Sequence, residues 1–386
     1  MGEGTRVKLL EVEKELSRLL FERKEEIRGL LVGLLSREHI LLLGPPGAAK
    51  SELAEELCSR IVWEGGGDRI GYFRWLLART STPEELFGPV SLRALEEDSY
   101  RRKTKGKLPE ARIAFLDEVF NCNSAVLNGL LSVLNERLFF NDGEPTQIPL
   151  EMVVAASNEP PDEREELEAL FDRFLLRYVV SYVREDGSFE ALLRRESEAP
   201  FRRTRITTSE LLEAQQEAQR VDSSGVLPAI AALRRELSEA GIPVSDRRYA
   251  KSLKLLRANA YLEGRREVVD EDLLLLANVL WAEPEQIREV RKKVMVLASP
   301  ELSEAQDLLE EAREIHKKAT LALSGERAIE EGQEANAKLR ELTNRLLALR
   351  NDAERVSRGT EKIDEALSEV VEMNREVIHS WLGITI

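Results

Sequence analysis

One stretch of this sequence has the residue types and spacing of a phosphate-binding loop. It consists of Gly44, Pro45, Pro46, Gly47, Ala48, Ala49, Lys50 and Ser51, between the apolar residues 40–43 and a helix-forming segment. In such a loop, backbone N–H groups and a helix N-terminus bind a polyphosphate. A lysine there reaches the β- and γ-phosphates, and a serine hydroxyl joins a Mg²⁺ shell. We therefore expect Lys50 and Ser51 to contact a nucleotide and its metal, unless the pattern is an accidental strand, turn and helix.

One position of the loop departs from the usual pattern. Where G-x-x-x-x-G-K-[ST] has a glycine before the lysine, this chain has Ala49. Because this position usually begins the helix, we expect a methyl group to be tolerated there if φ is negative.

Two carboxylates end a later apolar run. Residues 113–116 are Ile, Ala, Phe and Leu, and Asp117 and Glu118 follow directly. In a nucleotide site such a pair divides the chemistry, with Asp117 holding Mg²⁺ and Glu118 polarising the attacking water. A solvated strand end has the same pattern, so the signal becomes strong only together with the upstream loop.

An amide follows the next apolar run. Asn158 comes after residues 152–156 and before two prolines. An asparagine at the tip of a strand beside the carboxylate strand can hydrogen-bond both the lytic water and the γ-phosphate. The alternative is an ordinary turn former before proline.

These residues need a scaffold of strands and helices. Helical spacing over residues 5–35 predicts one or two amphipathic helices, and strand-helix alternation over about 40–184 predicts a parallel sheet with helices on both faces. The five predicted strands are residues 40–43, 72–75, 113–116, 152–156 and 178–183. The fold class is therefore α/β.

Helices alone are predicted after about residue 204. Four cover residues 208–220, 225–240, 245–263 and 270–282, and three longer ones cover 300–323, 327–357 and 360–381. Ser245 and Asp270 are candidate N-caps, and Ser299 caps a helix with Pro300 at its first position. We place domain borders so that residues 1–203 form the α/β core, 204–298 an all-α lid and 299–386 a helical hairpin or three-helix arm.

Composition excludes several classes of protein. The 386 residues suffice for two or three domains, and the net charge of −15 disfavours nucleic acid as the main partner. No apolar run could span a membrane and no signal pattern begins the chain, so we expect a cytoplasmic protein. The two cysteines support neither a disulfide framework nor a zinc site.

Seven motifs in order carry a family resemblance. They are GPPGAAKS, LFGPVSLRAL, GKLPEARIAFLDEVF, LNGLLSVLNERLFFNDG, VVAASNEPP, ALFDRFLLR and VSDRRYAKSLKLL. Over about residues 5–297 the chain resembles the MoxR branch of the AAA+ ATPases, and most closely its RavA-type variant. This resemblance implies that Lys50 and Ser51 form Walker A, Asp117 and Glu118 form Walker B, and Asn158 is sensor 1, with ATP and Mg²⁺ bound.

The resemblance also assigns two arginines. Arg173 matches the arginine finger that reaches the γ-phosphate of a neighbouring subunit, and Arg247 matches sensor 2 in a lid that closes over the nucleotide. Arg177 and Arg248 are the alternatives for these two roles. An arginine supplied in trans makes hydrolysis depend on assembly.

Two insertions are expected from the same resemblance. Residues 84–106 contain the helix-2 insert, and residues 138–149, with Asn141, Asp142 and Gly143 as turn signal, read as a β-hairpin. A basic run over residues 101–107 could bind nucleic acid, although a solvated loop is the simpler interpretation because no aromatic ladder accompanies it.

The resemblance implies a Mg²⁺-dependent ATPase that forms a ring, with six subunits expected, and remodels a protein client, with a von Willebrand factor A domain protein as candidate partner. The alternatives are a nucleotide-gated scaffold with little hydrolysis, a DNA-associated motor, and metal insertion of the magnesium-chelatase type. From residue 301 the chain has 19 acidic against 12 basic residues and lacks the β-rich module of RavA-type proteins. This acidic arm could bind a partner or buttress the ring.

Overall fold

The chain divides into two compact units. The structure is a computed structural model that describes residues 2–64, 71–161, 165–194, 203–322, 328–355 and 358–382. The first unit comprises Met1–Pro228, Gly241–Val269 and Leu275–Ile287, and the second comprises Ala229–Ala240, Asp270–Leu274 and Arg288–Ile386. The domain borders expected after residues 203 and 298 are a different division and stay predictions.

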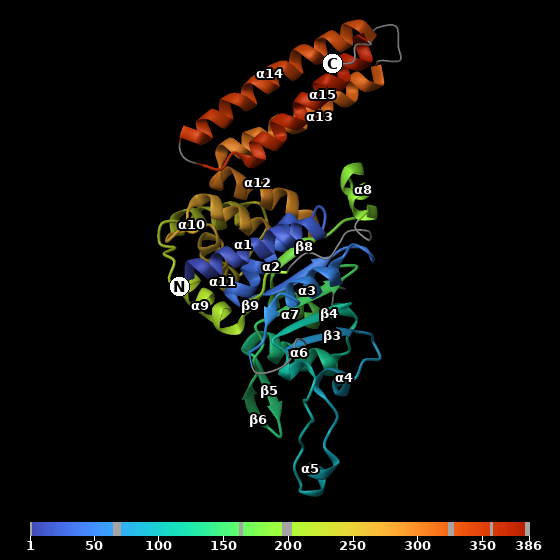
Figure 1. Ribbon diagram of the computed structural model, residues 1–386, viewed down its shortest axis with the longest axis vertical. Helices are drawn as coiled ribbons and strands as arrows, with labels where there is room; N and C mark the ends of the chain where they lie inside the picture. Colours follow the sequence, from blue (N-terminus) through green and yellow to red (C-terminus); the bar gives the residue numbers. More distant parts are fainter. Residues whose placement is uncertain are drawn as a thin grey trace. The chain divides into compact units, whose positions relative to one another are not determined.

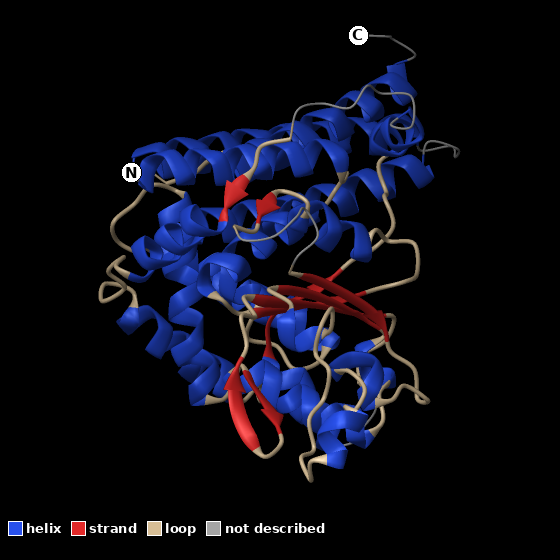
Figure 2. Cartoon of the chain, turned by 60° about the horizontal axis from the view of Figure 1, so that its bottom comes forward, coloured by secondary structure: helices blue, strands red, loops and turns tan. Residues whose placement is uncertain are grey.

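A five-stranded parallel sheet forms the centre of the first unit (Figures 1 and 2). The strands, in spatial order, are β3 (Tyr72–Leu76), β4 (Ile113–Asp117), β7 (Met152–Ser157), β1 (His39–Leu43) and β8 (Phe174–Val179). Every residue of β1 and β7 is buried, as expected for central strands covered on both faces. Because all five strands run the same way, their carboxyl ends share one edge, where ligands bind in such sheets.

Helices cover both faces of this sheet (Figure 2). The helices of this unit include α1 (Gly2–Leu19), α2 (Lys24–Ser36), α3 (Lys50–Cys58), α6 (Ser124–Glu136), α7 (Glu165–Arg173), α9 (Thr208–Gln219) and α11 (Asp246–Leu262). Helices α2, α3, α7 and α11 contact the sheet directly, and α1 and α9 pack on α2 and α11. The N-terminal segment thus forms two helices. Shorter elements are η1 (Leu108–Glu110), η2 (Val119–Asn121), α8 (Asp186–Arg194) and the parallel pair β2 (Ile61–Val62) and β9 (Ile206–Thr207).

The last strand of the sheet lies earlier than the sequence predicted. The prediction of residues 178–183 is wrong in position, because β8 begins at Phe174, directly after α7 ends at Arg173. Arg177 lies inside this strand and is buried with its guanidinium on backbone carbonyls. Because charged residues are seldom buried, Arg177 interrupts the run of apolar residues from which a buried strand is predicted.

The two predicted insertions lie side by side (Figure 1). The first contains α4 (Pro83–Phe87) and α5 (Leu92–Glu96), and the second is the hairpin of β5 (Leu138–Asn141) and β6 (Glu144–Gln147). Asp142 and Gly143 have φ of 62° and 76°, which is the two-residue turn that Asp-Gly favours. The hairpin prediction is therefore confirmed.

One helix predicted in the lid region is a 3₁₀-helix rather than an α-helix. The segment expected to be helical over residues 270–282 is the 3₁₀-helix η4 (Asp270–Asn278). Its buried Leu273 and Leu276 are three residues apart, the repeat of a 3₁₀-helix. The neighbouring elements are α10 (Leu227–Glu239), η5 (Pro284–Gln286) and α12 (Ile287–Ala298).

Three long helices form the C-terminal part of the second unit. They are α13 (Pro300–Ala322), α14 (Ala328–Arg355) and α15 (Glu361–Leu382), packed around buried residues that include Leu308, Leu339, Leu346, Val370 and Val377. Ser299 Oγ accepts a hydrogen bond from Leu302 N at 3.3 Å, which confirms the predicted cap. The helix break expected at residues 324–325 lies outside the described residues. In the described part of the chain, no helix is both long and apolar enough to span a bilayer.

Candidate active site

The loop between β1 and α3 has backbone angles that depend on its glycines. Gly44 has φ of 154°, and a Cβ there would lie 2.0 Å from the Val180 carbonyl oxygen. Gly47 has φ of 79°. Ala49 also has positive φ, 63°, and directly precedes α3. The condition we set for its methyl group, a negative φ, is therefore not met, and Ala49 adopts a conformation that glycine adopts at lower cost.

Lys50 is folded back onto the loop that it ends. Its Nζ donates to the carbonyl oxygen of Gly44, to that of Pro45 at 3.0 Å, and to Asn158 Oδ1 at 3.0 Å. Burial lowers the pKa of Lys50, while Asp117 and Glu118 act in the opposite direction. The ammonium is thus held by oxygen atoms that phosphate oxygens can replace.

The two carboxylates lie where β4 leaves the sheet. Glu118 has φ of 51°, an unusual angle for a side chain of this size. Its carboxylate accepts hydrogen bonds from Asn158 Nδ2 and, at 3.3 Å, from Asn121 Nδ2. Asn158 therefore joins Lys50 to Glu118. Sequence reasoning missed Asn121, whose position three residues after Glu118 on η2 was the available signal.

A cavity of about 610 Å³ collects these residues. It is lined by loop residues 46–51 and by Asp117, Glu118 and Asn158. The other part of the lining comes from the α1–α2 junction, the segment after β8, and α8, and includes Leu20, Phe21, Arg23, Tyr182, Val183, Phe189 and Leu192. A polar end with phosphate-binding groups and a partly apolar end fit a nucleotide. Sequence reasoning missed this second part, because its residues come from separate elements without a motif.

The cavity also contains the donors that a magnesium ion needs. Ser51 and Asp117 both line it, and hydroxyl and carboxylate oxygens are ligands that Mg²⁺ prefers. Magnesium keeps several waters, so a site with two protein ligands and phosphate oxygens is sufficient. The residues present therefore fit the metal.

Two of the four candidate arginines are buried. Arg177 is 3% exposed and donates to the carbonyl oxygens of Phe174 at 3.1 Å, Phe171 at 3.0 Å and Trp281. Arg248 is 5% exposed and donates to those of Phe174 at 2.8 Å and Leu175 at 2.9 Å. Backbone carbonyls hold the guanidinium of Arg177, and backbone carbonyls together with Asp172 Oδ1 at 3.2 Å hold that of Arg248, which leaves both unsuited to reach a ligand.

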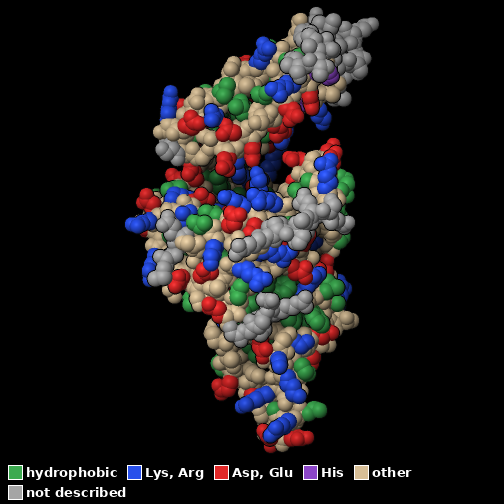
Figure 3. Space-filling view, in the orientation of Figure 1, with side chains coloured by type: hydrophobic (Ala, Val, Ile, Leu, Met, Phe, Trp, Pro, Cys, Tyr) green, Lys and Arg blue, Asp and Glu red, His purple; other side chains and the backbone are tan. Residues whose placement is uncertain are grey.

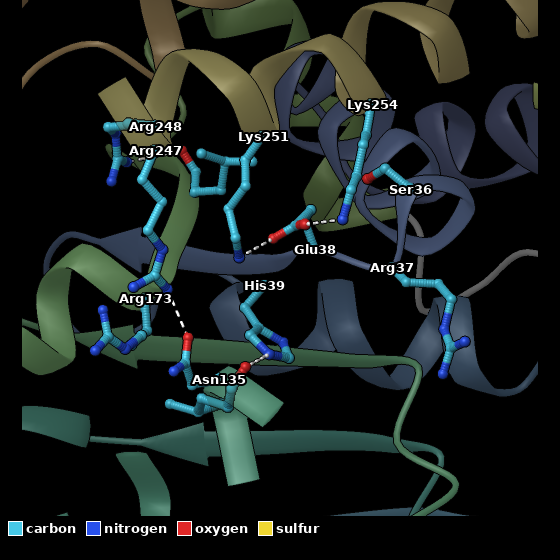
Figure 4. A network of polar contacts seen from close by, with 12 residues as sticks. Ser36, Arg37, Glu38, His39, Asn135, Arg173, Arg247, Arg248, Lys251 and Lys254 are labelled. Carbon is cyan, nitrogen blue, oxygen red and sulfur yellow. Dashed lines mark hydrogen bonds and ion pairs between the residues drawn. The ribbon is translucent and has the colours of Figure 1, made fainter. Parts of the chain in front are cut away.

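Arg173 and Arg247 have freer guanidiniums and lie next to each other (Figure 4). Arg173 has an ion pair with Asp172 at 3.6 Å, and its Nε has no hydrogen-bond partner in the structure. Burial lowers the pKa of Arg173, and the charge of Arg247 lowers it further. Neither arginine lines the cavity of its own chain. The roles of Arg173 as finger and of Arg247 as sensor 2 in the lid therefore stay predictions.

Two family profiles match the sequence. Residues 7–218 match a profile described as the MoxR domain in the MoxR-vWA-beta-propeller ternary systems, and residues 225–294 match an AAA lid domain. A solved structure of a candidate ATPase from Cytophaga hutchinsonii superposes with a TM-score of 0.62 at 20% identity, over 77% of this chain and 96% of that chain. The predicted fold class, with its parallel sheet, lid and helical C-terminal region, is confirmed.

Three relatives extend this similarity. Two uncharacterized proteins of Methanocaldococcus jannaschii are 36% identical over 378 residues, which is 96% of this chain and 97% of the relative, and 38% identical over 292 residues, which is 75% and 76%. The chaperone MoxR1 of Mycobacterium tuberculosis is 28% identical over 205 residues, or 52% of each chain.

Proposed function

Because this chain belongs to the MoxR family of AAA+ ATPases, we propose that it hydrolyses ATP with Mg²⁺ at the cavity around Lys50. The observation that carries the proposal is the polar chain from Lys50 through Asn158 to Glu118. An ammonium, an amide and a carboxylate are in contact in this order, which supports roles for them as the phosphate-binding cation, the sensor of the γ-phosphate and the general base. A pure nucleotide-binding scaffold has no need of the last of these groups.

The residues of the chain itself have separate tasks in this reaction. Lys50 exchanges its carbonyl partners for the β- and γ-phosphate oxygens, and Asn158 then turns its amide toward the γ-phosphate and the attacking water. Glu118 orients that water and accepts its proton. Ser51 and Asp117 would hold Mg²⁺, which would supply positive charge for the phosphates.

The described lining contains Lys50 and, at the α1–α2 junction, Arg23, and we propose that a second copy of the chain supplies a further positive charge for the transferred phosphoryl group. Arg173 and Arg247 lie together outside the cavity of their own chain, and both are absent from its lining. A neighbouring copy that presents this pair would complete the site, with Arg173 as the finger and Arg247 as sensor 2 acting in trans. Such a head-to-tail contact generates a ring where its rotation closes and a spiral where it does not, and a ring of six subunits is the expectation.

We also propose that hydrolysis remodels a protein client. The support is the description of the matched MoxR profile, which places such domains in systems with vWA and β-propeller proteins, and the name of the chaperone relative. A von Willebrand factor A domain protein is the partner to test first. The resemblance to RavA-type proteins in particular stays a prediction.

The test compares steady-state ATPase rate per subunit with protein concentration. We expect the specific activity of the wild type to rise with concentration as subunits assemble. Glu118→Gln removes the base and should lower kcat about 10²- to 10⁴-fold, and Arg173→Ala should lower it about 10³-fold or more. The size of each protein is measured in ATP.

Mixing the two variants then tests whether the site is shared. A Glu118→Gln subunit still has Arg173, and an Arg173→Ala subunit still has Glu118. A site is therefore complete wherever an Arg173→Ala subunit binds the nucleotide and a Glu118→Gln subunit supplies the arginine. Partial recovery of activity supports the proposal. If the wild type assembles with ATP but turns over no faster than Glu118→Gln, the protein is instead a nucleotide-gated scaffold.

A further inference from the structure

A buried ion cluster lies at the opposite end of β1 from the phosphate loop. Glu38, which directly precedes β1, has a side chain only 4% exposed. Its two carboxylate oxygens pair with Lys251 Nζ at 2.9 Å and Lys254 Nζ at 3.0 Å, both on α11 (Figure 4). The five residues of β1 separate this cluster from the loop, so Glu38 cannot contact the nucleotide.

The same face of α11 carries Arg247. Residues 247, 251 and 254 are spaced by four and seven along this helix, which places them on one side. Glu38 therefore anchors the helix face from which Arg247 projects. Arg248, in the same turn, holds the carbonyls of Phe174 and Leu175 where α7 passes into β8, next to Arg173.

His39, the residue after Glu38, contacts α6, the helix to which Arg247 is hydrogen-bonded. His39 Nε2 lies 2.8 Å from the Leu134 carbonyl oxygen near the end of α6, and Val153 N donates to His39 Nδ1 at 3.0 Å. The next residue of α6, Asn135, accepts a hydrogen bond from Arg247 Nη2 at 2.6 Å. The dipeptide of Glu38 and His39 thus holds both α11, which carries Arg247, and α6, which Arg247 contacts through Asn135.

We propose that Glu38 is a positioning residue that sets Arg247 beside Arg173 for use by a neighbouring subunit. Two guanidiniums placed next to each other repel, so their arrangement needs an external support. Without the Glu38 charge, the partly buried Lys251 and the half-exposed Lys254 would lose their shared partner, and the first turns of α11 would shift. This inference rests on the proposed function, because it concerns how the shared site is built.

The experiment measures ATPase kinetics of Glu38→Gln, with Glu263→Gln as matched control. Glu263 pairs α11 with Arg28 of α2, but at the opposite end of the helix from Arg247. We expect Glu38→Gln to lower kcat about 10- to 100-fold, as a misplaced group does, with the affinity for a fluorescent ADP analogue unchanged within twofold. Glu263→Gln should keep the wild-type kcat.

A mixing experiment separates positioning from general damage to the fold. Lys50→Ala removes nucleotide binding but leaves Arg173 and Arg247 in place. Added to Glu38→Gln, it should restore activity, because it supplies arginines to the intact nucleotide site of the Glu38→Gln subunit. The same addition to Arg173→Ala serves as the reference for a shared site.

The outcomes distinguish the two proposals. If Lys50→Ala rescues Arg173→Ala but not Glu38→Gln, or if Glu38→Gln has wild-type kcat, the positioning role is wrong and the shared site stands. If it rescues neither variant, the shared site itself is wrong, and the positioning role with it. Should Glu38→Gln melt below the assay temperature, Lys251→Met, which removes one of the two anchors, is judged by the same criteria.

Discussion

Ala49 takes a backbone conformation that costs an alanine more than a glycine. Its φ of 63° lies in the left-handed region, directly before Lys50. A non-glycine residue pays about 1–2 kcal/mol there. Strained residues of this kind are common at ligand sites, and Glu118, with φ of 51°, is a second one in the same cavity.

Replacing Ala49 by glycine should therefore stabilise the protein. We expect Ala49→Gly to raise the free energy of unfolding by about 1 kcal/mol, measured by urea denaturation. Ala48→Gly is the control, since Ala48 is buried and has no positive φ. It should lower stability by about 0.5–1 kcal/mol. Equal destabilisation by both changes would contradict strain at Ala49.

His39 gives the protein a specific sensitivity to acid. Burial, helped by the charge of Arg137, lowers the pKa of His39 from 6.5 to about 3, despite the opposing charge of Glu38. Between pH 6.5 and 3 the unfolded chain binds a proton at this residue and the folded chain does not. The free energy of unfolding should thus fall by about 1.4 kcal/mol for each unit that the pH drops in this window.

The His39→Gln variant tests this pH dependence. Glutamine does not titrate, so its plot of unfolding free energy against pH, from 6.5 to 4.5, should be flatter than the wild-type plot by about 1.4 kcal/mol per unit. Stability at pH 7 is expected to be lower than in the wild type, because the contacts to Leu134 and Val153 change. Parallel curves for the two proteins would show that His39 is protonated in the native state.

At the scale of elements, the hairpin and the helix-2 insert support each other. Asp142 in the hairpin turn accepts hydrogen bonds from Ser99 Oγ at 2.6 Å and Tyr100 N at 2.7 Å. Asn141 Oδ1 accepts one from Arg102 N at 2.7 Å. The insert presents exposed Leu92, and basic side chains gather over it in Figure 3. Its order thus depends on contacts with a segment about 40 residues later in the chain.

Asp142→Gly should release the insert without straining the turn. Glycine suits the φ of 62° at this position, so the main loss is the carboxylate acceptor. We expect faster amide hydrogen exchange and faster proteolysis over residues 92–102, with the five-stranded sheet unaffected. Glu96→Gly, an exposed change inside the insert, controls for local flexibility. Unchanged exchange at residues 99–101 in Asp142→Gly would refute the dependence.

The sequence predicted those elements whose signals are local. Strand β1, the loop to Lys50, strand β4 with its carboxylates, and the Asp142 turn each lie within about ten consecutive residues, so periodicity and motif sufficed. Strand β8 was misplaced because the charged Arg177 is buried in it. The anchor of Glu38 on Lys251 joins residues 213 positions apart, and the apolar end of the cavity combines separate elements. Such long-range contacts leave no local pattern.

At the scale of the molecule, each compact unit has its own core. We therefore expect the two units to unfold in separate thermal transitions. The three-helix part of the second unit buries Leu346 completely, whereas the next residue, Leu347, is 38% exposed. The phosphate loop and its cavity belong to the first unit. A ligand in this cavity stabilises only the unit that folds around it, while a cavity made in the helical bundle weakens only the bundle.

Calorimetry with ADP and two leucine variants tests this independence. Leu346→Ala should lower the free energy of unfolding of the bundle by about 2–5 kcal/mol and move one thermal transition down. Leu347→Ala should leave this transition nearly unchanged. ADP at 100 times its Kd should stabilise the other transition by about 2.7 kcal/mol in all three proteins. A single transition that responds to both ADP and Leu346→Ala would mean that the units unfold together, and that nucleotide binding stabilises the C-terminal helices as well as the site.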